Sequence, residues 1–246
     1  KRVGELSGLA AKNPAAGEDR PDGRDAYLAQ IDGLVFGSSR AQGVVRGSRF
    51  YHADMGLTLA FPSGWSVTNL PNQVVAVSPN DDAVIKLSAV GVPPDVRPRE
   101  IVARLFRGMP TTKGEEIEVN GLEGYATTLR STGLPWGNQG PSTVAVVYMN
   151  GLAYVFQGGT RLNAAHAAFE PLFMSSVRTF RRLRDNEYEA AEPDRIRVVR
   201  VREGETIAQL AATSPLREYP AEQLRLLNGL YPNREPQAGQ TLKLVD

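Results

Sequence analysis

The sequence predicts an α+β protein, in which an antiparallel sheet packed with helices is followed by a small βααβ domain. Three observations support this class. Apolar residues alternate in short segments between residues 55 and 158, which is the period of strands that bury one face. Two longer segments, 98–108 and 164–176, carry apolar residues at helical spacing instead. A charged stretch at 183–195, closed by Pro193, is typical of a linker and precedes a last segment with its own strand and helix patterns.

Composition limits the partners and the chemistry. A chain of 246 residues exceeds the ~100–200 residues of one typical domain, so we expect two domains. The formal net charge of +1 supplies no field that would gather nucleic acid or an anionic membrane. No apolar run approaches the roughly 18 residues of a membrane span. The absence of cysteine excludes disulfides, thiolate catalysis and cysteine-ligated zinc.

Residues 1–50 are predicted to be a helical lead-in that follows an upstream domain. Short helices are expected over 3–11 and 24–33, separated by a stretch rich in Gly and Pro. The chain starts at Lys1 without an apolar signal segment, so we expect it to begin inside a longer precursor.

The middle region, 51–182, is predicted to form the main α+β domain. Apolar residues alternate over 57–61, the turn Pro62-Ser63-Gly64 follows, and the alternation resumes at Trp65, which indicates a hairpin. The two helical segments interrupt a series of further predicted strands, several of which are separated by Asn-Gly turns: 73–78, 84–90, 115–119, 124–130, 142–149 and 153–158.

The last region, 196–246, is predicted to be a separate small domain. A strand pattern at 196–201 leads through the turn Arg202-Glu203-Gly204-Glu205 into an apolar helix. Thr206 is a natural N-cap of that helix, since its hydroxyl can accept an unpaired backbone N–H of the first turn. A second helix over 220–227 ends at Asn228-Gly229, and a turn and strand close the chain at 238–244.

This order of elements, with its Leu-Asn-Gly-Leu and Ala-Gly-Gln-Thr-Leu motifs, resembles the LysM family. The resemblance implies a glycan-binding groove between the first strand–helix turn and the loop after the second helix. Two segments, 214–219 and 231–237, are longer and more charged than in compact LysM repeats. The alternative is that the glycines, Thr206 and Asn228 serve only the turns and caps. The positions that match the groove are Gly204, Glu205, Thr206, Ile207, Asn228, Gly229, Leu230 and Tyr231.

Two weaker resemblances cover the rest of the chain. The segment GLTLAFPSGW at 56–65, followed by Asn69, resembles the entry strand and turn of PsbP-like domains. Residues 24–50 resemble the segment after the catalytic domain in bacterial envelope HExxH zinc peptidases related to the CAAX prenyl proteases. Together they imply a non-catalytic accessory region in the periplasm or cell envelope, with zinc held only by a missing upstream catalytic domain.

The implied partners are peptidoglycan or an envelope protein, together with that upstream domain. One alternative is a stand-alone envelope binding or assembly module without protease activity. A second alternative is an enzyme whose site has no recognised motif, which would need a cleft of perturbed titratable groups.

The residues that could carry chemistry do not form a complete active site. The two histidines, His52 and His166, are 114 positions apart and neither belongs to an HExxH motif, so no metal site and no catalytic residue are predicted. We expect both to be structural or surface residues. Ser63 is expected in a turn, because no Gly-x-Ser-x-Gly elbow surrounds it.

Trp136 is the one candidate contact for a ligand or a protein outside the last domain. It lies in a predicted hairpin loop with three glycines, at 133, 137 and 140. The acidic pairs Asp81-Asp82 and Glu115-Glu116 are expected to be solvated turn and edge charges. The arginines at 178–184 are expected to belong to the solvated linker.

Overall fold

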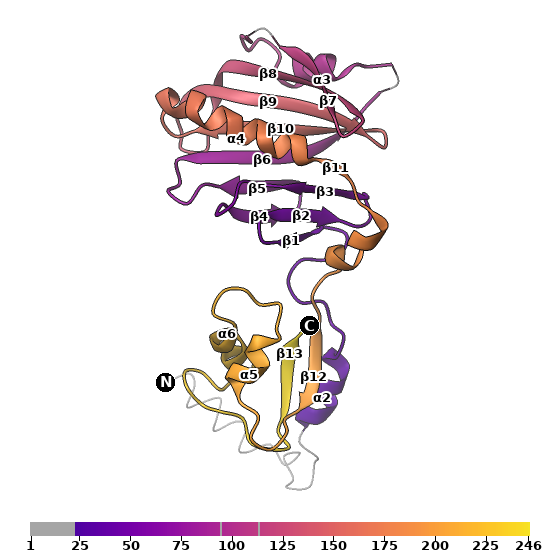
Figure 1. Cartoon of the computed structure of the whole chain (residues 1–246), viewed down its shortest axis with the longest axis vertical. Helices are drawn as coiled ribbons and strands as arrows, with labels where there is room; N and C mark the ends of the chain where they lie inside the picture. Colours follow the sequence, from indigo (N-terminus) through magenta and orange to yellow (C-terminus); the bar gives the residue numbers. More distant parts are fainter. Residues whose placement is uncertain (1–22, 94, 113) are drawn as a thin grey trace, which may run out of the picture. The chain divides into compact units, whose positions relative to one another are not determined.

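The structure is a computed structural model that describes residues 23–93, 95–112 and 114–246. The helix predicted over 3–11 lies outside the described residues. The described chain forms two compact units (Figure 1). The central unit comprises residues 37–193, and the C-terminal unit comprises residues 194–246 together with residues 23–36.

The central unit contains two antiparallel sheets (Figure 1). The larger sheet has seven strands in the order β4-β5-β6-β10-β9-β8-β7 and the smaller has four in the order β1-β2-β3-β11. The bounds of the seven are β4 Ser66–Leu70, β5 Gln73–Val77, β6 Ala83–Gly91, β7 Glu115–Val119, β8 Leu122–Gly133, β9 Gln139–Met149 and β10 Leu152–Thr160. The bounds of the four are β1 Val44–Arg46, β2 Arg49–His52, β3 Leu57–Ala60 and β11 Arg181–Arg182.

Both faces of the seven-stranded sheet are buried. Alternate residues of β10 point to opposite faces: Tyr154 and Phe156 join the core against the smaller sheet and helix α4, His166–Thr179, whereas Ala153 and Val155 pack with helix α3, Pro98–Leu105. Side chains that alternate across a strand can serve two cores at once, which explains why β9 over 144–149 and β10 over 152–156 are apolar without interruption. Helix α4 crosses one face of the sheet in Figure 1.

Gly158 of β10 lets helix α4 come close to the sheet. A Cβ at this position would lie 2.4 Å from the ring of Phe173, which is only 2% exposed. Real Cβ atoms do not approach a ring so closely, so the strand needs glycine here. The phenyl ring therefore packs directly on the backbone of the strand.

The hairpin predicted over 57–67 is wrong. Strand β3 pairs with β2 and β11, whereas β4 pairs with β5 in the other sheet. The turn at 62–64 thus carries the chain from one sheet to the other, and Trp65 anchors the crossing against Phe169 and Phe173. Alternation specifies which face of a strand is buried but leaves its pairing partner open.

The stretch predicted as a linker, 183–195, is mostly part of the central unit. It contains two short 3-10 helices, Asp185–Glu187 and Glu189–Ala191, and Ala191 is fully buried. The guanidinium of Arg181 donates two hydrogen bonds of 2.6 Å to the carboxylate of Glu187. Two of the charges that suggested a solvated linker are therefore paired within the central unit, Glu187 with Arg181 and Glu192 with Arg40.

The C-terminal unit has the predicted βααβ order. Strands β12, Ile196–Arg200, and β13, Thr241–Val245, are antiparallel and flank helices α5, Ile207–Ala212, and α6, Pro220–Leu227. Its core consists of buried apolar residues from both helices, from β13 and from the segments that follow β12 and α6: Val201, Ile207, Leu210, Ala211, Leu224, Leu230 and Leu242. With both units composed of antiparallel strands and packed helices, the predicted α+β class is confirmed.

A segment before the central unit completes the C-terminal unit. Helix α2, Gly23–Ile31, is followed by Asp32, whose carboxylate accepts a 2.8 Å hydrogen bond from the backbone N–H of Val198. Backbone hydrogen bonds of 2.8 Å join Gly33 and Leu34 to Ile196. The segment 32–36 thus covers the outer edge of β12, which would otherwise offer unpaired backbone groups. Residues expected as a lead-in are part of this fold.

Candidate functional site

The turn between β12 and α5, residues 201–206, is fixed by its own side chains. Gly204 has a φ of +76°, a left-handed conformation that glycine adopts without strain. The hydroxyl of Thr206 accepts the backbone N–H of Gln209, and the Gln209 side chain accepts the backbone N–H of Thr206 at 2.9 Å. This is a reciprocal capping box, so the predicted N-cap is confirmed.

The loop between α6 and β13, residues 228–240, is anchored by Asn228. Its side-chain amide donates to the backbone carbonyls of Leu224, at 2.9 Å, and Lys243, at 2.8 Å. Its side-chain oxygen accepts the backbone N–H of Lys243 at 2.7 Å. These bonds tie the end of helix α6 to strand β13 and occupy both ends of the amide group.

Glu235 joins the turn to the loop. One carboxylate oxygen accepts the backbone N–H of Ile207, at the start of α5, at 2.8 Å, and the other accepts a hydrogen bond from the guanidinium of Arg225 on α6. The N–H of Ile207 and the positive Arg225 lower the pKa of Glu235 below its ordinary value, because both favour the ionised form. The carboxylate of Glu235 therefore adds a side-chain link between the two walls of the predicted groove, which backbone hydrogen bonds of Val201 with Gly239 and Gln240 also join.

The structure divides the eight predicted groove residues into two kinds. Ile207 and Leu230 are core residues, 0% and 7% exposed, and the Asn228 side chain serves the fold. Their backbone N–H groups are also hydrogen-bonded within the unit: that of Ile207 to Glu235, that of Asn228 to the carbonyl of Leu224, and that of Leu230 to the carbonyl of Arg225. The other five are half-buried or exposed at the rim of the turn and loop: Gly204, Glu205, Thr206, Gly229 and Tyr231. Tyr231 is 57% exposed, so it presents most of its ring to solvent.

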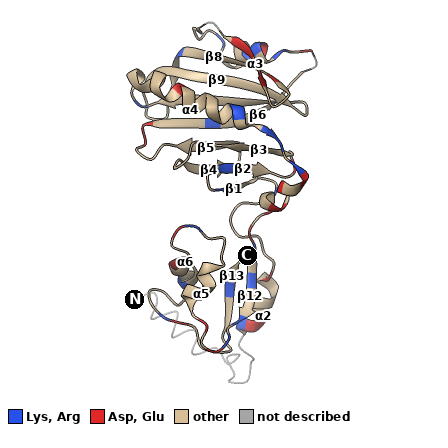
Figure 2. Ribbon diagram, in the orientation of Figure 1, with Lys and Arg blue, Asp and Glu red and all other residues tan. Residues whose placement is uncertain are grey.

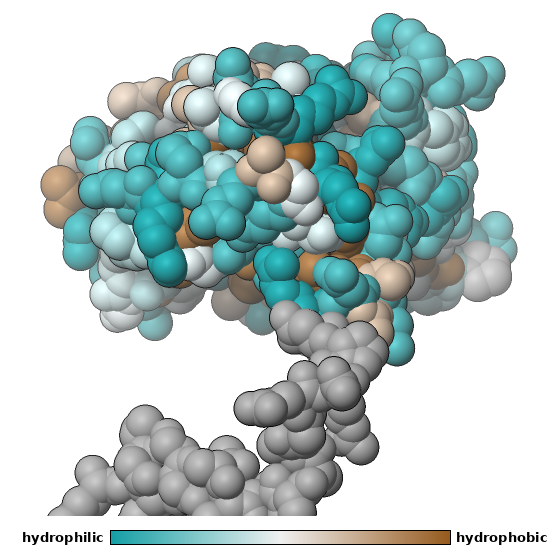
Figure 3. All heavy atoms as spheres, turned by 90° about the horizontal axis from the view of Figure 1, so that it is seen from below, coloured by the Kyte–Doolittle hydropathy of each residue, from teal (hydrophilic) through white to brown (hydrophobic). Residues whose placement is uncertain are grey.

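The surroundings of this surface carry charges of both signs. The turn and loop contribute carboxylates at 203, 205 and 235, and helix α6 and the same segments contribute guanidinium groups at 202, 225 and 234. Figure 2 shows basic and acidic residues interspersed along the ribbon. The face drawn in Figure 3 is mainly hydrophilic, with small apolar patches between polar groups. Balanced charge creates no strong field for a polyanion.

Each of the two histidines has a structural position. His52 ends β2, is 8% exposed, and accepts the backbone N–H of Met55 at Nδ1. His166 begins α4, and its Nε2 lies 3.1 Å from the hydroxyl of Thr143. Burial lowers the pKa of both imidazoles, so both are neutral near pH 7. Within the described part of the chain, no group of three or more His, Cys, Asp or Glu is placed to hold a metal ion.

Trp136 is partly committed to the fold. Its indole N–H donates a 3.3 Å hydrogen bond to Asp81, which also pairs with Arg161 at 3.6 Å. The acidic turn at 81–82, expected to be solvated, therefore ties the β8–β9 loop to the β5–β6 turn.

Among the described residues, no helix is both long and apolar enough to cross a membrane.

Comparisons with known proteins agree with the assignment of the C-terminal unit. Residues 199–245 match the model of the LysM domain, so the predicted LysM domain is confirmed. Glu235 falls within this match, yet the sequence pattern did not single it out. A sequence signal for Glu235 does exist: it is an acidic residue in the long loop after α6. A carboxylate there can accept the unpaired backbone N–H groups at the start of helix α5. No curated protein matches the chain.

Several solved structures are similar to the chain. They include cyanobacterial PsbP from Synechocystis, at 15% identity over 60% of this chain and 98% of that chain, with a TM-score of 0.42. The Ran-binding protein Mog1p of Saccharomyces cerevisiae is 16% identical over 53% of this chain and 92% of that chain, with a TM-score of 0.38. LpqN of Mycobacterium tuberculosis, described as involved in cell envelope biogenesis, is 14% identical over 67% of this chain and 98% of that chain, with a TM-score of 0.36.

Proposed function

We propose that the chain binds an uncharged glycan containing N-acetylglucosamine, as in peptidoglycan, through the turn and loop joined by Glu235. The observation that carries this proposal is the match of residues 199–245 to the LysM domain, combined with the hydrogen bonds that hold both walls of its groove together. The exposed backbone of Gly204 can pair with an N-acetyl amide and needs no charge to do so, whereas the N–H and carbonyl of Gly229 already bond to Leu226 and Arg234.

The ring of Tyr231 supplies the apolar contact in this proposal. It is 57% exposed next to the buried Leu230, so it can cover the apolar face of a sugar without any change in the core. An aromatic side chain gives contact area at low cost in conformational entropy, because only two side-chain torsions are fixed.

Calorimetric titration of the full chain with the soluble tetramer of N-acetylglucosamine tests this function. Binding should be saturable, and Tyr231→Ala should weaken it by about tenfold, the effect of losing roughly 1–2 kcal/mol of aromatic contact. Tyr27→Ala is the matched control, since Tyr27 is 56% exposed on helix α2 of the same unit. Absence of binding, or an equal effect of both substitutions, would contradict the proposal.

We further propose that the chain is a non-catalytic accessory region of a zinc peptidase and brings the catalytic domain to the cell envelope. The support is the resemblance of residues 24–50 to the segment that follows the catalytic domain in such enzymes. In this proposal the catalytic domain holds the zinc ion, and the chain itself binds the peptidoglycan or the envelope protein. The alternative is a stand-alone envelope binding or assembly module.

The gene distinguishes these two versions. An HExxH motif encoded upstream of Lys1 in the same reading frame supports the accessory role, and a gene without one supports the stand-alone module. The purified chain, incubated with casein and zinc, is expected to leave the casein intact. Cleavage that copurifies with the chain would contradict both versions and favour an enzyme with an unrecognised site.

A further inference from the structure

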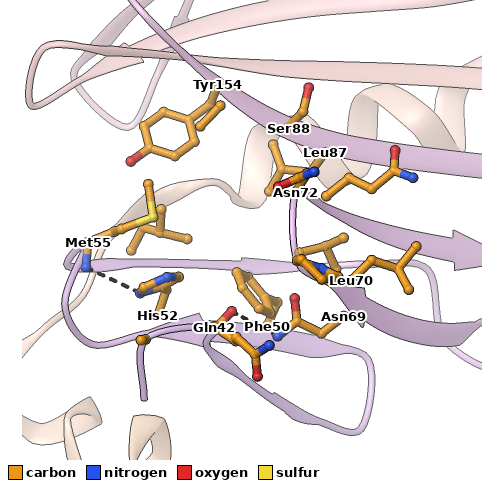
Figure 4. A pocket seen from close by; sticks show the side chains of 16 residues that line it. Gln42, Phe50, His52, Met55, Asn69, Leu70, Asn72, Leu87, Ser88 and Tyr154 are labelled. Atoms are coloured by element: carbon orange, nitrogen blue, oxygen red, sulfur yellow. Dashed lines mark hydrogen bonds between the residues drawn. The ribbon is translucent and has the colours of Figure 1, made fainter. Parts of the chain in front are cut away.

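A cavity of about 440 Å³ lies between the two sheets of the central unit (Figure 4). Residues of β2 and β3 line it from the smaller sheet, and residues of β5, β6 and β10, with the β4–β5 turn, line it from the larger sheet. A volume of this size falls within the range of ~300–1,000 Å³ that small-molecule sites occupy.

The lining combines an apolar interior with neutral polar groups. Buried apolar side chains form the interior: Phe50, Leu57, Val74 and Leu87, all at most 5% exposed. Amide and hydroxyl side chains lie toward the edge: Gln42, Asn69, Asn72, Gln73 and Ser88. None of the 16 lining residues is an aspartate, glutamate, lysine or arginine. A charged ligand would therefore lose its hydration without gaining a counter-charge.

Tyr154 places an unpartnered hydroxyl at this cavity. The residue is 2% exposed, lines the cavity, and its hydroxyl oxygen is buried without a hydrogen-bond partner. Burial raises the pKa of this phenol to about 12, so it stays protonated and acts as a donor. Figure 4 shows the hydroxyl directed toward the end of the cavity where Met55 and His52 lie. A buried hydroxyl without a partner is unfavourable, and a ligand that accepts its proton removes that cost.

The walls of the cavity are held in place before any ligand enters. The side-chain amide of Asn69 donates to the backbone carbonyls of Gln42 and Gly43, at 2.8 and 2.9 Å, and so connects the end of β4 to the segment before β1. At the other end, the N–H of Met55 donates to His52. Met55 is half-buried and its side chain lies near Tyr154 in Figure 4, where a flexible thioether can adapt to an incoming group.

We propose that this cavity is a binding site for a neutral, mainly aliphatic small molecule that carries one hydrogen-bond acceptor, such as the hydroxyl or carbonyl of a lipid-like compound. The apolar body packs against the interior between the sheets, and the acceptor receives the hydrogen bond from Tyr154. This inference is independent of the glycan site, which lies in the other unit.

Titration of the full chain with 1-octanol, followed by calorimetry, tests the site. Saturable binding at one molecule per chain is expected, and octanoate, which has the same length but a negative charge, should bind at least tenfold more weakly. Tyr154→Phe keeps the ring and removes the hydroxyl, and should weaken binding of 1-octanol by about fivefold. The fluorescence of the buried Trp65 verifies that the variant is folded.

Tyr148→Phe is the matched control. The hydroxyl of Tyr148 donates to the backbone carbonyl of Val96 at 2.7 Å, and Tyr148 does not line the cavity, so its loss should leave the affinity unchanged. The proposal is overturned by the absence of saturable binding, by equal affinity for octanoate, or by equal effects of the two substitutions.

Discussion

Replacing Glu235 by alanine removes a side chain that links the turn at 201–206 and helix α6 to the loop at 228–240. The backbone N–H of Ile207 loses an acceptor at 2.8 Å, and Arg225, whose side chain is 16% exposed, loses its ion pair. One neutral hydrogen bond contributes about 0.5–1.5 kcal/mol, and an ion pair with a half-exposed carboxylate contributes up to about 1 kcal/mol. We therefore expect the C-terminal unit to lose about 1–2 kcal/mol of its free energy of unfolding.

This loss is large for so small a unit. A fold of roughly 70 residues is stable by about 3–10 kcal/mol, so the substitution should speed amide hydrogen exchange in peptides from 196–246 by about 5- to 30-fold. Both tryptophans, Trp65 and Trp136, belong to the central unit. The urea midpoint that their fluorescence reports should therefore be the same with and without the substitution.

Two control variants sharpen the result. Glu235→Gln keeps an acceptor for Ile207 and should lose about half as much stability, since only the charge is removed. Glu203→Ala removes an exposed glutamate from the neighbouring turn and should have no effect. Unchanged exchange in Glu235→Ala, or equal changes in Glu235→Ala and Glu203→Ala, would refute the linking role.

Three further outcomes follow from particular contacts. The Arg181 guanidinium lowers the pKa of Glu187 to about 2, so their pair stabilises the central unit above pH 4.5 and is lost as pH falls toward 2. Glu187→Gln should cost about 1–2 kcal/mol at pH 7 in urea unfolding, after screening by water, and clearly less at pH 3; a cost independent of pH would contradict this. Thr206→Ala should destabilise the C-terminal unit by about 1 kcal/mol through the lost N-cap, measured by hydrogen exchange, with Thr206→Ser as the conservative control. Gly158→Ala should lower the thermal midpoint of the central unit, because its Cβ would meet Phe173 at 2.4 Å, and an unchanged midpoint would show that α4 is not held so tightly.

The order of elements in the C-terminal unit could be predicted because its signals are local. The cap at Thr206 and the glycine turns at Gly204 and Gly229 each depend on residues within a few positions of one another. Strands 73–77 and 115–119 were predicted nearly to the residue for the same reason, since alternation is visible in any short window.

The parts that could not be predicted depend on long-range contacts. Glu235 acts on Ile207 across 28 positions, and Asp32 acts on Val198 across 166 positions, so no local pattern reveals either pair. The false hairpin over 57–67 has the same origin, because the pattern shows two strands and a turn but not that the turn changes sheets. The cavity between the sheets depends on this topology as well, and Tyr154 alone in the sequence is an ordinary strand residue.

Binding to the cell-wall polymer itself tests the central claim most directly. The full chain is mixed with insoluble peptidoglycan and sedimented, with and without an excess of the soluble N-acetylglucosamine tetramer, alongside Tyr231→Ala and Tyr27→Ala. The account predicts that the unsubstituted chain and Tyr27→Ala enter the pellet, that the tetramer releases them, and that Tyr231→Ala stays largely in solution. A chain that remains in the supernatant, or that sediments equally well with the tetramer present, would contradict glycan binding by the LysM domain.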